Sequence, residues 1–129
     1  MTLALRGSLL VATAATATVA AWLLFTALFV LPRHDPGHVL MWTLVAVASG
    51  GLVATSIVAT RDADPAPPAV MVLLVGLSMM ALVFGLVAAL SFLTGNDEGY
   101  LLVIGVVLIL HGMLGLIWSG RLIRAREPR

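Results

Sequence analysis

Hydrophobic positions along the chain fall into four long uncharged runs, residues 7–31, 39–60, 69–94 and 100–120. Between Gly7 and Gly120, every Asp, Glu and Arg lies in one of the three short connectors that separate these runs. As an α-helix that rises about 1.5 Å per residue, each run is long enough to cross a hydrocarbon core about 30 Å thick. Because backbone N–H and C=O groups in lipid must be bonded within their own segment, the pattern predicts four membrane-spanning helices.

The predicted fold is an all-α membrane protein, a four-transmembrane-helix bundle that forms a single integral membrane domain over residues 1–129. A β-barrel is excluded because the runs are apolar on every face and do not alternate between apolar and polar positions. The first run follows Arg6 and is rich in Ala, as in a secretory signal peptide. Its apolar character continues to Leu31, well beyond a typical signal core, so we expect it to be retained as the first helix.

Composition supports this class and limits the partners. Hydrophobic residues make up 61% of the chain and charged residues 10%, against about 45 to 50% and about 25% in soluble domains. The absence of cysteine excludes disulfides and thiolate metal sites. A net charge of +1 gives no reason to expect a nucleic-acid partner, so the predicted partners are the lipid bilayer and either other membrane subunits or further copies of the chain.

The basic residues predict an orientation. All of them are Arg, and in an alternating four-pass path only Arg33 falls on one side, whereas the other side holds Arg6, Arg61, Arg121, Arg124, Arg126 and Arg129. By the positive-inside rule, both termini are then cytoplasmic. The use of Arg without Lys in an Ala-rich chain is typical of a GC-rich bacterial genome. The predicted location is therefore the bacterial cytoplasmic (inner) membrane, multi-pass, with the N- and C-termini inside.

A weak internal similarity indicates two tandem hairpins, residues 7–61 and 69–123. A shift of 62 positions aligns Asp35-Pro36-Gly37-His38 with Asp97-Glu98-Gly99-Tyr100, and also aligns Gly50 with Gly112. The two Asp residues are also good N-caps for the second and fourth helices, so capping alone accounts for them.

The two predicted outer turns carry a set of polar side chains that form a candidate outer-face cluster: His34, Asp35, His38, Asp97 and Glu98. Nitrogen and oxygen donors of this kind can hold a divalent cation. His34 and His38 are four residues apart, but Pro36 and the helix start between them work against a shared helix face. No metal site is predicted.

His111 is the only ionisable side chain inside any of the four runs, so it is the candidate intramembrane functional residue. A neutral imidazole there could pass protons, contact a quinone or bind a haem iron or copper ion. The structural alternative is a hydrogen bond to a neighbouring helix, with four candidate partners: Ser49, Thr55, Ser56 and Ser78. Haem needs a second imidazole at similar depth, and Met79, Met80 and Met113 as copper ligands are more typical of apolar packing. No cofactor is predicted.

Small residues recur at helical spacing and predict close helix packing at Gly50, Gly105, Gly112 and Gly115. Similar stripes are Ala46-Gly50-Ala54 in the second run and Ala14, Ala17, Thr18 and Ala21 in the first.

Close-packing stripes without an enzyme motif favour a non-enzymatic function. The leading hypothesis is an accessory or scaffold subunit of a larger membrane complex that acts through helix packing. One alternative is a small homo-oligomeric channel or transporter whose path is lined by the second and fourth helices. The other is an electron-transfer subunit that uses His111 at a quinone or haem pocket.

Overall fold

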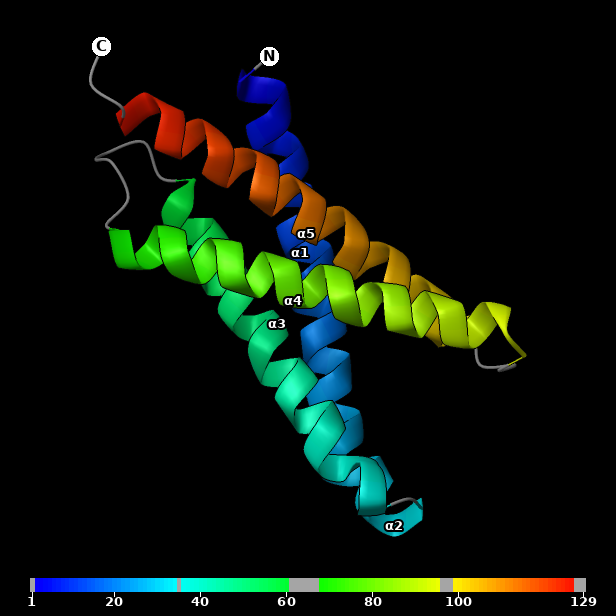
Figure 1. Ribbon diagram of the computed structural model, residues 1–129. Helices are drawn as coiled ribbons and strands as arrows, with labels where there is room; N and C mark the ends of the chain where they lie inside the picture. The colour runs from blue at the N-terminus through cyan, green and yellow to red at the C-terminus, as the bar shows by residue number, and fades with distance from the viewer. Residues whose placement is uncertain (1, 35, 61–67, 96–98, 127–129) are drawn as a thin grey trace.

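The computed structural model describes residues 2–34, 36–60, 68–95 and 99–126, and these are almost entirely helical (Figure 1). The first half of the chain contains α1 (Thr2–Phe25), a π-helical turn (Thr26–Val30), α2 (Leu31–His34), a 3-10 turn (Pro36–His38) and α3 (Val39–Ala59). The second half contains α4 (Pro68–Leu93) and α5 (Gly99–Arg126). Four helical segments are long and apolar enough to cross a membrane: Ala4–Val30, Val39–Ala59, Pro68–Leu93 and Gly99–Arg121.

The prediction of an all-helical chain with four long apolar helices is thus confirmed, and the differences lie at helix ends. The first helix changes to a π turn at Thr26, shortly before Pro32. In a straight α-helix the Pro32 ring would meet the carbonyl of Leu28, and a π turn placed there changes the local register. α5 continues to Arg126, beyond the predicted end at residue 120, because its last turns are rich in good helix formers.

The helices form two hairpins that cross each other. α1 packs along α3 and α4 packs most extensively along α5, while α3 also contacts α4 and α1 contacts α5. In Figure 1 the hairpins diverge away from the crossing, so that α2 and the junction of α4 with α5 lie at separate ends of the molecule. The start of α1 and the end of α5 lie towards the same side (Figure 1).

Each long helix buries one side chain per turn on its inward face. Spacings of three and four residues give an inward row on α1 of Leu9, Thr13, Thr16, Val19 and Leu23, and rows on the other helices that include Ser49 and Ser56 of α3, Ser78 of α4, and His111 and Ser119 of α5. Many of the large exposed side chains are Leu, Val, Ile, Phe or Met. The inward rows therefore combine Leu with Ser, Thr and His side chains, while the outer surface is largely bulky and apolar, as suits a lipid solvent.

α4 and α5 meet along a row of small residues, which we name the α4–α5 seam: Ser78, Gly85, Gly105, Gly112 and Gly115. A Cβ atom added to Gly85 would lie 2.7 Å from the Gly105 carbonyl oxygen, and one added to Gly112 would lie 2.6 Å from the Ser78 carbonyl oxygen. Real Cβ atoms do not approach backbone that closely, so the two helices touch backbone to backbone. Both helices repeat the contact after seven residues, which keeps it on one antiparallel seam.

The small residues of α1 and α3 behave differently from those of the seam. Ala14, Ala17, Thr18 and Ala21 are all exposed, and so are Gly50 and Ala54. A Cβ added at Gly50 would meet nothing within 4 Å, so Gly50 does not take part in close packing within this chain. Gly50 and Gly112, which the proposed repeat aligns, therefore have unlike surroundings. The duplication stays a prediction.

Candidate functional site

His111 lies on the inward face of α5, near the middle of its apolar span, and is fully buried. The helix geometry that places it there is simple, because Ile104, Leu108, His111 and Gly115 follow one another at intervals of four, three and four residues. The imidazole is thus held within the bundle, away from the bulky apolar outer surface. This agrees with the tendency of ionisable side chains in apolar helices to face the bundle interior.

Both ring nitrogens of His111 have hydrogen-bond partners on other helices. Its Nδ1 lies 2.6 Å from the Thr16 hydroxyl oxygen of α1, and its Nε2 lies 2.9 Å from the Ser56 hydroxyl oxygen of α3. Thr16 and Ser56 are themselves fully buried. The three side chains join three helices at one point, and we name this group the imidazole junction.

A neutral His111 satisfies both bonds in either tautomer. A neutral imidazole has one N–H donor and one nitrogen acceptor, and each hydroxyl can donate or accept. In one arrangement Nδ1–H donates to Thr16 and the Ser56 hydroxyl donates to Nε2. In the other, the Thr16 hydroxyl donates to Nδ1 and Nε2–H donates to Ser56. The junction therefore has two hydrogen-bonded arrangements, which differ in the ring tautomer and in which hydroxyl donates to the ring.

A second polar contact fastens α5 to α3 two turns further along. The indole Nε1 of Trp118 donates to the carbonyl oxygen of Ala59 at 3.0 Å. Ala59 is the last residue of α3, where carbonyl groups lack partners within the helix, so the indole supplies the missing donor. The Trp118 side chain is buried.

Aromatic rings connect the helices on the side where the hairpins diverge. Trp22 of α1, Trp42 of α3 and Tyr100 of α5 are in mutual contact, with ring centroids 5.1 to 5.9 Å apart. The rings are tilted relative to each other by 53 to 59°, an arrangement that aromatic pairs favour. These spacings leave the rings packed on one another, so the group acts as a bridge between helices.

The predicted outer-face cluster falls largely outside the described residues. Asp35, Asp97 and Glu98 are not described, and of the His34 side chain nothing is shown, while His38 is exposed next to the start of α3. Figure 1 shows α2 and the start of α5 apart, although Trp42 in the first turn of α3 contacts Tyr100 at the start of α5. Among the described residues, no group of three or more His, Cys, Asp or Glu side chains could hold a metal ion.

A metal ion that binds His111 would have to replace one of its two hydroxyl partners. A haem iron or copper ion binds a nitrogen lone pair, so it would displace Thr16 or Ser56 from the ring. Met79, Met80 and Met113 are exposed on the outer surface rather than gathered beside His111. The arrangement is suited to holding helices together and to exchanging protons between hydroxyl and imidazole.

Sequence reasoning found one partner of His111 and missed the other. Ser56 was among the predicted partners, but Ser49, Thr55 and Ser78 have no hydrogen bond to His111 in the described part of the chain, and Thr16 was not considered. A usable signal was present, since Leu9, Thr13, Thr16, Val19 and Leu23 follow a helical spacing. Uniform hydropathy concealed it, because no face of the first helix stands out as more apolar than the rest.

Comparison with known proteins gives no match for this chain to a protein family, to a curated protein or to a solved structure.

Proposed function

We propose that the chain is a multi-pass protein of the bacterial cytoplasmic membrane with both termini inside. Four apolar helices with bulky apolar outer surfaces support membrane insertion. The bias of Arg towards the side of the termini supports the orientation.

The orientation can be tested with single cysteines, because the chain has none of its own. In intact cells, a membrane-impermeant maleimide should label Thr94→Cys, whereas Ala125→Cys should be labelled only after permeabilisation. Labelling of Ala125→Cys in intact cells would contradict the proposed orientation.

Within that membrane, we propose that the protein is a non-catalytic accessory or scaffold subunit of a larger complex. The observation that carries this proposal is the outward row of small residues on α1, Ala14, Ala17 and Ala21, which is exposed in the described part of the chain. Small side chains let a second helix approach closely in lipid, where packing rather than the hydrophobic effect drives association. The α4–α5 seam and the imidazole junction, in contrast, are both made within the chain.

Mild detergent extraction followed by native mass spectrometry tests the scaffold proposal. The wild-type chain should co-purify with other membrane subunits, and the pair Ala14→Leu and Ala17→Leu should lose them while keeping the helical content and unfolding midpoint. The matched control is Val83→Leu, an exposed bulky position on α4, which should keep the complex. A chain that extracts only as a monomer, or a complex that survives the Ala-to-Leu pair, would contradict this role for the α1 face.

A second candidate, a small channel or transporter, draws support from the imidazole junction alone. Ser56 of α3 and His111 of α5 do face each other, as expected if the second and fourth helices line a path. For a proton to cross the junction, one hydroxyl would take up a proton from water as the other releases one, while the imidazole accepts at one ring nitrogen and donates from the other. Vesicles that contain the reconstituted protein and an internal pH-sensitive dye test this second candidate. The wild type should conduct protons, and His111→Gln should abolish the flux. Equal proton flux in the wild type and the variant would exclude a role for the imidazole.

A further inference from the structure

Two Arg side chains lie beside an apolar groove on the last turns of α5. The groove has a volume of about 370 Å³ and is lined by Leu116, Ile117, Gly120, Arg121 and Arg124. Leu116, Gly120 and Arg124 are spaced four residues apart, and Ile117 and Arg121 lie next to the first two of them, so all five are on one side of the helix. Arg124 is exposed and Arg121 is half-buried. The face therefore joins positive charge at the end of the helix to an apolar surface nearer the bundle centre.

Gly120 gives this groove its depth. It lies one helical turn from Leu116 and one turn from Arg124, so it is at the centre of the lining face. A Cβ added there would meet nothing within 4 Å. A larger side chain at residue 120 could thus be accommodated by the protein, but it would occupy the groove.

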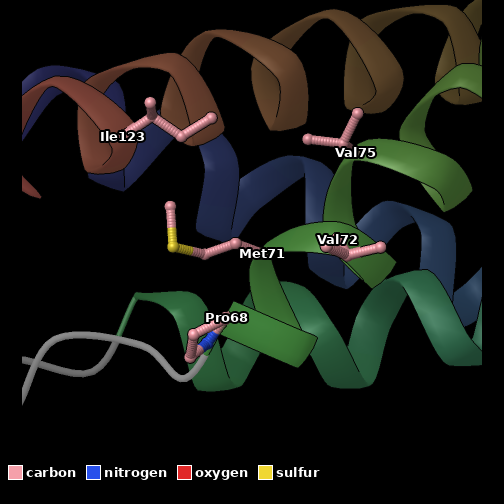
Figure 2. Close-up of a pocket in the computed structure, with 5 residues that line it drawn as sticks. All are labelled: Pro68, Met71, Val72, Val75 and Ile123. Carbon is pink, nitrogen blue, oxygen red and sulfur yellow. The ribbon is translucent and has the colours of Figure 1, made fainter.

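A second apolar groove flanks the same end of α5. It has a volume of about 420 Å³ and lies between α4 and α5, lined by Pro68, Met71, Val72, Val75 and Ile123. Figure 2 shows Met71 of α4 directed into the space towards Ile123 of α5. Ile123 immediately precedes Arg124 in the chain, so the second groove adjoins the cationic end of α5 that lines the first.

We propose that this end of α5 binds the phosphate headgroup of an anionic phospholipid in the inner leaflet, with acyl chains in the two flanking grooves. Charge complementarity supports this occupant, because a guanidinium offers paired N–H donors to phosphate oxygens. The grooves offer apolar surface for the chains of the same molecule. The inference rests on the proposed membrane insertion and orientation, but not on any partner subunit.

The size of the effect follows from charge. Each basic residue near an anionic membrane surface adds about 1 kcal/mol of attraction. Two of them therefore predict that an anionic lipid binds about 30-fold more tightly than a zwitterionic lipid at low salt. The preference should fall as ionic strength rises, because both charges are near water.

Native mass spectrometry of the purified full chain, titrated with phosphatidylglycerol or with phosphatidylcholine of identical acyl chains, tests the proposal. The wild type should bind the anionic lipid about 30-fold more tightly. The pair Arg121→Gln and Arg124→Gln should bind both lipids equally, whereas the control Arg33→Gln, exposed at the other end of the bundle, should keep the full preference. Gly120→Leu should weaken the binding of both lipids and leave the ratio of their affinities unchanged.

Several outcomes would overturn the inference. One is an anionic preference that persists in the Arg-to-Gln pair, and another is an equal loss in Arg33→Gln. A third is displacement of the bound lipid by millimolar inorganic phosphate, which would indicate a simple anion site. Since the measurement uses the isolated chain, a negative result would leave the scaffold proposal standing. Loss of partner subunits in the α1 variants would equally leave lipid binding untouched.

Discussion

Along the α4–α5 seam the helices meet where side chains are missing, whereas at the imidazole junction they meet through polar side chains. At the seam, Gly85 and Gly112 bring backbone against backbone, and any added atom must push the helices apart. At the junction, Thr16, Ser56 and His111 fill the space and satisfy each other's hydrogen bonds. The stability of the seam should therefore depend on side-chain volume and little on hydrogen-bonding groups. The stability of the junction should depend on hydrogen-bonding groups and less on volume.

The largest expected effect is a loss of stability when volume is added to the seam. Gly112→Ala places a Cβ against the Ser78 carbonyl oxygen and the Leu82 side chain, so α4 and α5 must separate. Overpacking of this kind costs about 1 to 3 kcal/mol, and we expect the upper end because backbone has to move. The free energy of unfolding, measured by titrating SDS into mild detergent and following helicity by circular dichroism, checks this.

The control for the seam is Gly76→Ala on α4, the other helix of the seam. Gly76 is exposed and a Cβ there would meet nothing within 4 Å, so the variant should be neutral or slightly more stable, as Ala favours helix over Gly. Equal losses in the Gly76 and Gly112 variants would show that the seam is not a close backbone contact.

The next effect tests whether the junction acts as a unit. Thr16→Val and Ser56→Ala should each destabilise the wild-type chain by about 0.6 to 1.7 kcal/mol, from the average to the maximum value for hydrogen bonds between membrane helices. In a His111→Leu background the same changes should cost close to nothing, because the partner is already gone. Double-mutant cycles in the SDS titration provide the coupling energies.

Thr55→Val is the matched control for these cycles. Among the described residues, the Thr55 hydroxyl donates only within its own helix, to the carbonyl oxygens of Gly51 and Leu52. Its substitution should be independent of His111. A coupling energy between Thr55 and His111 as large as that of Ser56 would mean that the cycles report general loosening of the bundle and not hydrogen bonds.

The contrast between seam and junction also explains what the sequence could predict. Charge placement and run length gave the four helices, because lipid imposes a minimum length and satisfies no backbone group. The inward faces were harder, since every face of every helix is apolar. Ala14, Ala17 and Ala21 resembled a packing stripe but point outward, while Thr13 and Thr16 point inward.

At the imidazole junction, the useful sequence signal was an ionisable residue in a run where such residues are rare. His111 stood out as the only ionisable residue in an apolar run, and its burial followed from that. Its partner Thr16 is 95 residues away and belongs to a common residue type, so only the arrangement of α1 against α5 reveals the pair. Likewise, the contact of Gly85 with Gly105 depends on the antiparallel register of α4 and α5.

A smaller effect is expected at the indole contact that extends the junction. Trp118→Phe removes the donor to the Ala59 carbonyl oxygen while keeping an aromatic ring, so it should cost about 1 kcal/mol of stability. The control Trp22→Phe keeps a ring beside Trp42 and Tyr100 and should cost less. If both variants lose the same stability, ring size rather than the hydrogen bond is what matters at residue 118.

The smallest expected effect is a gain, and it lies where the seam contains a polar atom. Ser78 is fully buried, its hydroxyl has no hydrogen-bond partner within the described residues, and its Oγ lies against Gly115. An unsatisfied buried hydroxyl is costly, so Ser78→Ala should stabilise the bundle by about 0.5 to 1 kcal/mol in the SDS titration. Ser119→Ala is the counterpart, because the Ser119 hydroxyl donates to the Gly115 carbonyl oxygen and its removal should bring no gain. A loss of stability in Ser78→Ala would mean that this hydroxyl finds a partner in the membrane, and the seam would then depend on chemistry as the junction does.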